Sequence, residues 1–412
     1  MTNSPGNPSA RHALLAGFLG WTLDAFDFFV IVFLYDTLAR EFSVTKKAIV
    51  LTTAATLALR PVGALLFGLL ADRYGRRVPL MANVIYFSLI EVLCGFAPNY
   101  TAFFVLRALF GIGMGGEWGV GASLAMEAAP KRWRGVLSGI LQGGYPMGYL
   151  LASIAARFVL PTLGWRWMFW LGALPALLAL YIRAKVLESE AWAQHRAASM
   201  TAVLRIVASH WKRFVYLVLL MTFMMFLSHG TQDLYPDFLK EVHKLSQRQV
   251  ANIAILYNCG AMVGAILFGA LSQKIGRRFG MLAALAMCLL VLPLWAFGTG
   301  VLGFLVAPVL MQMATQGAWG VIPVHLNELA ADSARGLMPG LTYQLGILIA
   351  SPTNSIQYAL QERFGYSWAL AGFQTVTILS LALLLWWGAE AHGKSFIREL
   401  HQEKVPQEIA PP

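Results

Sequence analysis

Twelve apolar stretches follow one another along this chain, and they decide which folds are open to it. They cover residues 13–35, 48–71, 78–97, 102–128, 136–160, 167–187, 214–238, 250–271, 279–298, 301–328, 337–360 and 366–389. Each holds at least 20 residues, enough for an α-helix rising about 1.5 Å per residue to cross the ~30 Å hydrocarbon core of a bilayer. Transmembrane β-strands give a weaker, alternating pattern. The sequence therefore predicts an all-α membrane protein with twelve transmembrane helices.

The composition agrees with this prediction and excludes other classes. Of the 412 residues, 58% are hydrophobic and 12% are charged, about half the charged share of a soluble protein. A soluble enzyme and a disordered chain are therefore excluded. The three cysteines, Cys94, Cys259 and Cys288, lie inside apolar stretches and suit neither a disulfide framework nor a metal site. No small-residue cleavage site follows the first stretch, which we interpret as a retained helix rather than a signal peptide.

The basic residues are distributed unevenly between the loops. With the N-terminus inside, 20 of the 31 Lys and Arg residues fall in inner segments, 9 in outer segments and 2 within spans. Inner loops of membrane proteins are enriched in Lys and Arg, so we expect both termini in the cytoplasm. The expected location is the inner membrane of a bacterium.

The two halves of the chain repeat at an offset of 201 residues. Residues 68–77 match 269–278, residues 116–120 match 317–321, and Glu127 and Arg134 are answered by Glu328 and Arg335. A fixed offset over several separate matches indicates a duplicated six-helix unit. We therefore predict two six-helix bundles related by pseudo-two-fold symmetry. The expected divisions are an N-terminal bundle (1–187), a cytoplasmic linker (188–213), a C-terminal bundle (214–390) and a cytoplasmic tail (391–412).

Eight ionisable residues fall within the predicted spans, where charges are rare. They are Asp24, Asp27, Arg60, Glu91, Arg107, Glu117, His229 and Asp233. A charge facing lipid at the bilayer centre costs roughly 3 kcal/mol on insertion scales. We therefore expect these side chains to face a cavity or one another.

Among these residues are cations that can bind an anion and carboxyl groups that can carry a proton. Arg60 is the best candidate for binding a substrate carboxylate and His229 the second, since both can be cations. Further predicted binding residues are Gln232, Tyr145 and Gln344. Predicted proton-coupling residues are Asp24, Asp27, Asp233 and Glu117, because a desolvated carboxyl group beside a like charge can titrate near neutrality.

Structural alternatives stay open for the same residues. Arg60 can simply neutralise Asp24 or Asp27, since buried charges are usually paired. His229 and Asp233 are four residues apart and can hydrogen-bond to each other to steady their helix. Arg107 suits a structural role as well as a coupling role.

The loop between the second and third spans resembles the signature of the major facilitator superfamily. It reads Gly68-Leu-Leu-Ala-Asp72-Arg73-Tyr-Gly75-Arg76-Arg77, and residues 107–115 are similar to a second motif of that superfamily. The resemblance implies a secondary transporter that alternates access between two bundles. It also implies gating roles for Gly68, Asp72, Arg73, Gly75, Arg76, Arg77 and Arg107. The structural alternative is that the loop charges only anchor the loop at the membrane surface.

A narrower resemblance lies in the seventh span. Residues 228–236, Ser-His-Gly-Thr-Gln-Asp-Leu-Tyr-Pro, are similar to the signature of lactate and pyruvate permeases in the sialate:proton symporter branch. Met225 and Asp237 depart from that pattern. The resemblance implies import of a small monocarboxylate with a proton. Another organic acid (an aromatic acid, a dicarboxylate or a sialic acid) and a non-transporting membrane sensor are the alternatives. We expect no enzyme activity, cofactor, metal or nucleic acid partner, and a monomer in the bilayer.

Overall fold

The computed structural model describes residues 8–397, and nearly all of them are helical. Arg398, Lys404 and most of the predicted tail lie outside the described residues. The first half consists of α1 (Pro8–Val30), α2 (Tyr35–Glu41), α3 (Lys46–Tyr74), α4 (Arg77–Gly95), α5 (Tyr100–Ala128), α6 (Arg134–Gln142), α7 (Gly144–Phe158), α8 (Leu160–Leu163), α9 (Trp165–Trp170) and α10 (Leu174–Lys185). Short turns of 3₁₀ helix join several of them, at Ile31–Leu34, Lys131–Trp133 and Leu171–Ala173.

Two short helices, α11 (Glu190–His195) and α12 (Met200–Ser209), connect this half to the second. The second half consists of α13 (Trp211–Gln232), α14 (Tyr235–Glu241), α15 (Gln247–Ile275), α16 (Arg277–Phe297), α17 (Ala307–Leu329), α18 (Met338–Ala350), α19 (Thr353–Phe364) and α20 (Tyr366–Trp387). A π-helical turn, Leu302–Val306, precedes α17, and a 3₁₀ turn, Asp332–Ala334, follows it. The domain boundaries predicted from the sequence stay a prediction.

The apolar stretches form helices as expected, but not all of them are single helices. Within the described residues, ten helices are long and apolar enough to span a membrane. The predicted fifth span is divided at Gly143 into α6 and α7, and the eleventh is divided at Ser351 and Pro352 into α18 and α19. Proline has no N–H to donate and glycine weakens a helix, so both positions favour a break. The fold is an all-α membrane protein of two helical halves.

The repeat also appears in the backbone conformation. Gly75 has φ +107° and its equivalent Gly276 has φ +96°, and Gly164 and Gly365 have φ +84° and +77°. These values lie in the left-handed region, which residues with a Cβ atom rarely adopt. Each glycine therefore terminates one membrane helix and begins the turn into the next at the same place in both halves.

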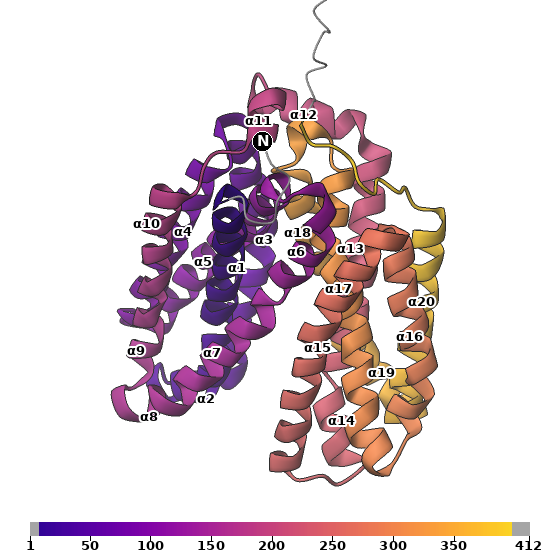
Figure 1. Cartoon of the computed structure of the whole chain (residues 1–412). Helices are drawn as coiled ribbons and strands as arrows, with labels where there is room; N and C mark the ends of the chain where they lie inside the picture. Colours follow the sequence, from indigo (N-terminus) through magenta and orange to yellow (C-terminus); the bar gives the residue numbers. More distant parts are fainter. Residues whose placement is uncertain (1–7, 398–412) are drawn as a thin grey trace, which may run out of the picture.

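The two halves meet at one end of the molecule and diverge toward the other (Figure 1). Helix α1 begins and α20 ends at the upper end in this view, where α11 and α12 also lie; we call this end the tail face and the opposite end the far face. Contacts between the halves join α6 to α15 and α17, and α18 to α3 and α5. The interface is thus built from the same helices of the repeat on both sides.

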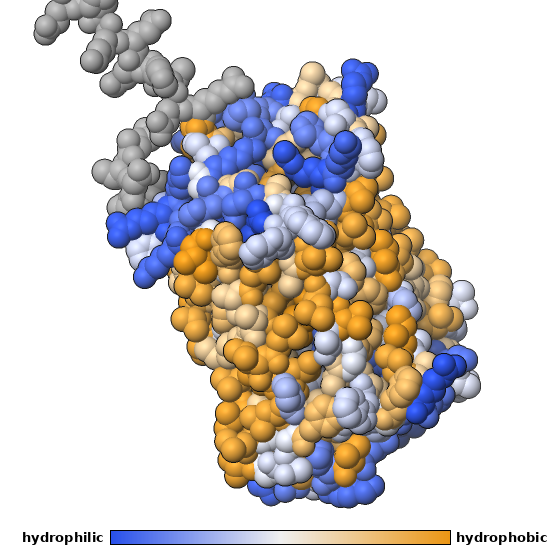
Figure 2. All heavy atoms as spheres, turned by 90° about the vertical axis from the view of Figure 1, so that its right-hand side faces the viewer, coloured by the Kyte–Doolittle hydropathy of each residue, from blue (hydrophilic) through white to orange (hydrophobic). Residues whose placement is uncertain are grey.

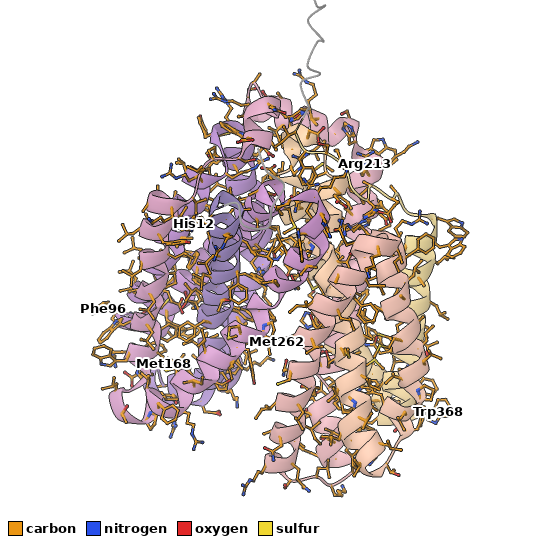
Figure 3. All side chains as sticks on the ribbon, viewed as in Figure 1. His12, Phe96, Met168, Arg213, Met262 and Trp368 are labelled. Carbon is orange, nitrogen blue, oxygen red and sulfur yellow. The ribbon has the colours of Figure 1, made fainter. Side chains whose placement is uncertain are left out.

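The face of the molecule drawn in Figure 2 is divided into an apolar belt and two polar ends. The side chains of Phe96 and Trp368 point outward from the two halves, with 63% and 67% of their surface exposed (Figure 3). These two residues are part of a large set of exposed apolar side chains, and such an extended apolar surface is covered by lipid or a partner. The chain is therefore a multi-pass membrane protein.

Candidate functional site

A cluster of ionisable side chains lies buried in the first half. Asp24 and Asp27 of α1 are 0% exposed, and so are Glu91 of α4 and Arg107 of α5. Arg107 donates a hydrogen bond from Nη1 to Glu91 Oε2 at 2.8 Å. The pair of carboxyl groups on α1 lies close enough to Glu91 and Arg107 for all four to interact electrostatically. The structure thus brings together charges from three helices, as charge burial in a membrane requires.

Arg60 of α3 lies beside this cluster, but it is not held in an ion pair with the acidic side chains. Its side chain interacts electrostatically with Asp24 and contacts the hydroxyl group of Tyr343 on α18. Only 4% of Arg60 is exposed, and its Nε and Nη2 atoms have no hydrogen-bond acceptor among the described residues. Both carboxylate oxygens of Asp24 are likewise without a donor in this part of the chain. Arg60 and Asp24 are therefore neighbours, not a closed ion pair.

Glu117 of α5 is a further buried carboxyl group at the same interface of helices. It is 1% exposed, and neither carboxylate oxygen has a hydrogen-bond donor within the described residues. A Cβ atom on Gly20 would lie 2.1 Å from Glu117 Oε1, so the glycine makes room for this carboxyl group. Asp24 is the charged group that acts on it. Glu117 thus adds a carboxyl group from α5 to the acidic cluster, beside Gly20 of α1.

His229 and Asp233 face the first half from the second. His229 Nδ1 lies 3.1 Å from Asp233 Oδ2, and their side chains are 44% and 30% exposed. Arg60 is close enough to act on His229 across the interface. Asp233 falls within the membrane span Trp211–Glu241, as the sequence predicted, but the helix is interrupted there, because α13 ends at Gln232 and α14 begins at Tyr235. Asp233 therefore lies at a helix break, where its side chain is more accessible than in a helix interior.

The rest of the predicted binding set lies around these groups. Gln232 donates to Gln312 Oε1 of α17 at 2.8 Å, and Gln344 donates to the carbonyl oxygen of Gly115 at 3.5 Å across the halves. Tyr145 is acted on by the charges of Arg60, Asp233 and Asp24. Tyr145 therefore lies near the charged groups of both halves, and Gln344 bridges the halves.

Aromatic side chains form a packed block next to this site. Tyr343 stacks on Trp118, with ring centroids 4.4 Å apart, and Trp21 stacks on Tyr145 at 5.3 Å. Trp21 and Trp319 also pack edge-on against Tyr343. The indole N–H groups of Trp21, Trp118 and Trp319 have no acceptor among residues 8–397. Rings from both halves thus pack against one another across the interface.

The charges of the first half have no counterparts in the second. At the offset of 201 residues, Met225, Ser228, Ala261, Leu292, Pro308 and Ala318 stand where the first half has Asp24, Asp27, Arg60, Glu91, Arg107 and Glu117. The second half offers amides instead, from Gln312, Gln344, Gln357 and Gln374. The pseudo-symmetric scaffold therefore holds an asymmetric site: the first half contributes six buried ionisable side chains, and the second contributes His229, Asp233 and a set of amides.

A second group of contacts closes the interface at the tail face. The Asp72 carboxylate accepts hydrogen bonds from the backbone N–H groups of Gly336 and Leu337 at 2.7 and 2.9 Å, and from Arg76 Nη1 at 2.6 Å. Arg76 also donates to Glu127, whose Oε1 accepts from Arg335 Nη1 of the other half at 3.2 Å. Burial disfavours the charge of Arg76, but Glu127 and Asp72 outweigh it, so the pKa of Arg76 lies above its ordinary value. Acidic and basic side chains therefore alternate along a network that crosses the interface.

The other predicted gating residues support this loop or lie elsewhere. The Cα atom of Leu337 would be 2.8 Å from a Cβ atom on Gly68, so α3 and the start of α18 approach closely. Glu188 accepts from the backbone N–H of Arg76 and Arg77, and the carbonyl oxygen of Arg73 accepts from Arg196. Arg107 contacts none of these groups. It lies near the start of α5, on the other side of the acidic cluster.

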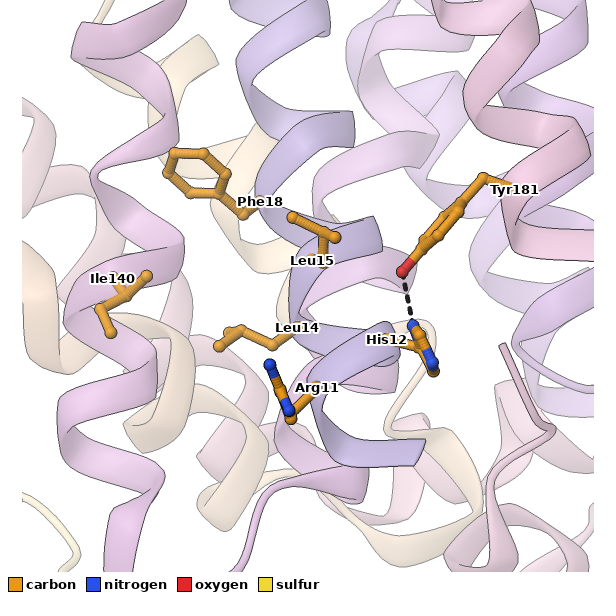
Figure 4. Close-up of a pocket in the computed structure, with 7 residues that line it drawn as sticks. All are labelled: Arg11, His12, Leu14, Leu15, Phe18, Ile140 and Tyr181. Atoms are coloured by element: carbon orange, nitrogen blue, oxygen red, sulfur yellow. Dashed lines mark hydrogen bonds between the residues drawn. The ribbon is translucent and has the colours of Figure 1, made fainter. Parts of the chain in front are cut away.

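A pocket of about 500 Å³ lies apart from the interface (Figure 4). Its lining residues come from α1, α6 and α10 of the first half, and His12 Nδ1 lies 2.6 Å from the Tyr181 hydroxyl group. It includes no residue of the second half. Within residues 8–397, no group of three or more His, Cys, Asp or Glu side chains is arranged to hold a metal ion.

Sequence reasoning missed three parts of the site. It left Glu91 as an unassigned interface residue, although it is the partner of Arg107. It did not name Trp21 or Gln312. An aromatic or amide residue inside an apolar stretch gives no sign of which way it points, whereas the charge of Glu91 was a signal that could have been paired with Arg107.

The comparisons with known proteins concern the family and the fold of the chain. The family model of the Major Facilitator Superfamily matches residues 17–351. A carboxylic acid transporter protein homolog of Saccharomyces cerevisiae is 30% identical over 84% of this chain and 61% of its own length. The sialic acid transporter NanX of Escherichia coli is 27% identical over 95% of this chain and 96% of its own length.

Among solved structures, the proton:xylose symporter XylE superposes with a TM-score of 0.77 at 21% identity, over 94% of this chain and 98% of that one. At that identity the likeness is one of fold. The match of the family model over most of the chain goes further, and the chain belongs to the major facilitator superfamily of membrane transporters, not to a family of enzymes.

Proposed function

We propose that this chain is a proton-coupled symporter of the sialate:proton symporter branch that imports a small monocarboxylate such as lactate or pyruvate. The observation that supports it most is the buried Arg60 guanidinium, which has two nitrogen atoms without a partner among the described residues. A carboxylate can accept two hydrogen bonds from one guanidinium, and burial strengthens this contact. An uncharged substrate would leave that charge unneutralised.

The orientation follows from the distribution of basic residues. The tail face contains the basic loops around Arg73, Lys131 and Lys274, so we place it in the cytoplasm of a bacterium. The halves then separate toward the outside. In this arrangement the site receives substrate from the external side, as import requires.

Proton and substrate binding are coupled through charge. Asp24 is a neighbour of Arg60, so its negative charge competes with a substrate carboxylate. A proton taken up by Asp24, Asp27, Glu117 or Asp233 removes one negative charge from the same region. The site loaded with one proton and one monoanion has the net charge of the empty site, and it crosses the closed intermediate at less electrostatic cost.

A second candidate substrate is an aromatic acid. The stacked rings of Trp118 and Tyr343 and the unpaired indole N–H groups support it, because aromatic faces and N–H donors suit a planar ring bearing polar groups. Lactate has no ring to stack. Competition of benzoate against labelled lactate separates the two candidates.

The test is uptake of labelled L-lactate into proteoliposomes, with and without an inside-alkaline pH gradient. We expect gradient-stimulated uptake that is lost in Arg60→Ala and Asp233→Asn and reduced in His229→Ala. Arg363→Ala, which removes an exposed arginine at the end of α19, is the matched control and should transport normally. The proposal is contradicted if folded protein takes up neither lactate nor benzoate. Uptake that does not respond to the pH gradient would contradict the coupling to protons.

A further inference from the structure

Phe396 lies between two arginines that come from different halves. Its ring centroid is 3.7 Å from the guanidinium carbon of Arg134 and 4.1 Å from that of Arg335. All three residues are buried, with 1%, 5% and 0% of their surface exposed. Arg134 and Arg335 are equivalent positions of the repeat, 201 residues apart. One aromatic ring near the end of the described chain thus joins a symmetry-related pair.

The segment that holds Phe396 is fixed to the second half. We call residues 388–397 the tail strap. Glu390 accepts a hydrogen bond from the backbone N–H of Arg278 at 2.9 Å, and His392 Nε2 lies 3.1 Å from the carbonyl oxygen of Gln273. The backbone N–H of Gly393 donates to Glu328 at 3.4 Å. The first part of the strap therefore moves with the second half.

The tip of the strap reaches the first half. Lys394 Nζ lies 2.8 Å from Asp332 Oδ1 of the second half, while its carbonyl oxygen accepts from Arg134 Nη1 of the first half at 2.6 Å. Arg134 is thereby held by a backbone acceptor and by the ring of Phe396. Cation–π contacts between buried groups are worth more than exposed ones. The strap therefore adds a link between the halves to those made by Asp72 and Glu127, and it shares Arg335 with the Glu127 contact.

We propose that the tail strap is a latch that holds the tail face closed. The halves cannot separate at this face while one ring stays in contact with both guanidinium groups, so opening must release Phe396 from at least one of them. The strap then sets the balance between the two access states of the transporter. This inference goes beyond the proposed function, because it concerns the gate and holds for any substrate.

The experiment measures opening of the tail face without substrate. Ser123 is fully buried and donates to the carbonyl oxygen of Arg335 across the interface at 2.6 Å. A Ser123→Cys reporter, in a variant whose three native cysteines are replaced, reacts with a water-soluble maleimide only when the halves part. In nanodiscs, Phe396→Ala should raise the labelling rate about tenfold, as expected for the loss of two cation–π contacts.

Two further variants make the outcome decisive. Phe396→Leu keeps apolar bulk but loses the π face, and it should raise the rate by a smaller factor. Phe364→Ala removes a ring that is 62% exposed at the end of α19, and it should leave the rate unchanged. Labelling at the unaltered rate in both Phe396 variants, with the reporter reacting fully in denaturant, overturns the latch. If Phe396→Ala does not fold, Phe396→Leu alone decides.

Discussion

The Asp72 carboxylate accepts a hydrogen bond from the backbone N–H of Gly336 at 2.7 Å, across the interface between the two halves. The repeat-related contact is made by a neutral side chain: Gln273 Oε1 accepts from the backbone N–H of Gly135 at 3.0 Å. Hydrogen bonds to an ionised acceptor are roughly twice as strong as neutral ones. Among the contacts that close the tail face, these two stand at equivalent positions of the repeat, and one is stronger than the other.

Replacing the strong contact should open the tail face more often. Asp72→Asn keeps the shape of the side chain but removes its charge, and we expect labelling at Ser123→Cys to rise about tenfold, since a charged hydrogen bond contributes roughly 1.5–3 kcal/mol. Asp36→Asn, at an exposed ion pair with Lys46, is the matched control and should have no effect. An unchanged rate in Asp72→Asn would show that this contact does not hold the gate.

Strengthening the weaker contact at Gln273 should have the opposite effect and close the tail face more often. Gln273→Asp introduces a carboxylate beside Arg277 and the Gly135 N–H, which the glutamine already contacts. We expect slower labelling and a lower maximal transport rate, because the closed state gains a charged hydrogen bond. Faster labelling would contradict this, and would indicate that the longer amide is required for the reach to Lys131.

The helices and the repeat were predictable because hydropathy and the offset of 201 residues are written directly in the sequence. So was the set of charges in the membrane, since each charged residue stands out in an apolar stretch. Their partners were not. The contact between Glu91 and Arg107 depends on how α4 and α5 rotate against each other.

Two other features could not be predicted from the sequence, for the same reason. Trp118 and Tyr343 are 225 residues apart in sequence, yet their rings stack across the interface. Nothing in the periodicity of α5 distinguishes this face from one that packs inside its own half. The break at Asp233 was also hidden, because the apolar stretch continues through it and the helix resumes after two residues.

Removing one member of the buried pair Glu91–Arg107 should destabilise the protein more than removing both. Arg107→Met leaves a buried carboxylate without its partner, which typically costs about 3–5 kcal/mol. The double variant Glu91→Gln with Arg107→Met removes both charges and should recover most of that loss. Thermal unfolding in detergent checks this, and a double variant no more stable than Arg107→Met would contradict it.

Acidification to pH 5 should leave the tail strap in place. Burial acts to raise the pKa of Asp332, but the hydrogen bond from Lys394 and the charges of Arg335 and Lys394 outweigh it, so the pKa lies below its ordinary value of 3.8. A carboxyl group with a depressed pKa stabilises the fold above its unfolded pKa, and this contribution is lost only as the pH falls through the folded value. Amide protection of residues 388–397, corrected for intrinsic exchange, should therefore be constant from pH 8 to 5; a fall in this range would contradict the prediction.

Asp24 and Asp27 should differ in their effects, although they are three residues apart on one helix. Asp24 is the neighbour of Arg60, so Asp24→Asn removes a competing negative charge, and we expect the Kd of the organic acid at pH 8 to fall about tenfold, equivalent to about 1.4 kcal/mol. Asp27 interacts instead with Glu91 and Asp24, so Asp27→Asn should leave that Kd nearly unchanged.

Transport assays then identify the proton carrier. If Asp27 accepts the proton, Asp27→Asn loses stimulation by the pH gradient but keeps exchange of labelled for unlabelled substrate, because exchange needs only reorientation of the loaded protein. Glu117→Gln is the comparison, since its carboxyl group is also buried and Asp24 is the charged group that acts on it within residues 8–397. The opposite result is gradient-driven uptake that persists in Asp27→Asn and disappears in Glu117→Gln. That result would assign the proton site to Glu117, whose carboxyl group packs against Gly20 of α1, and not to Asp27.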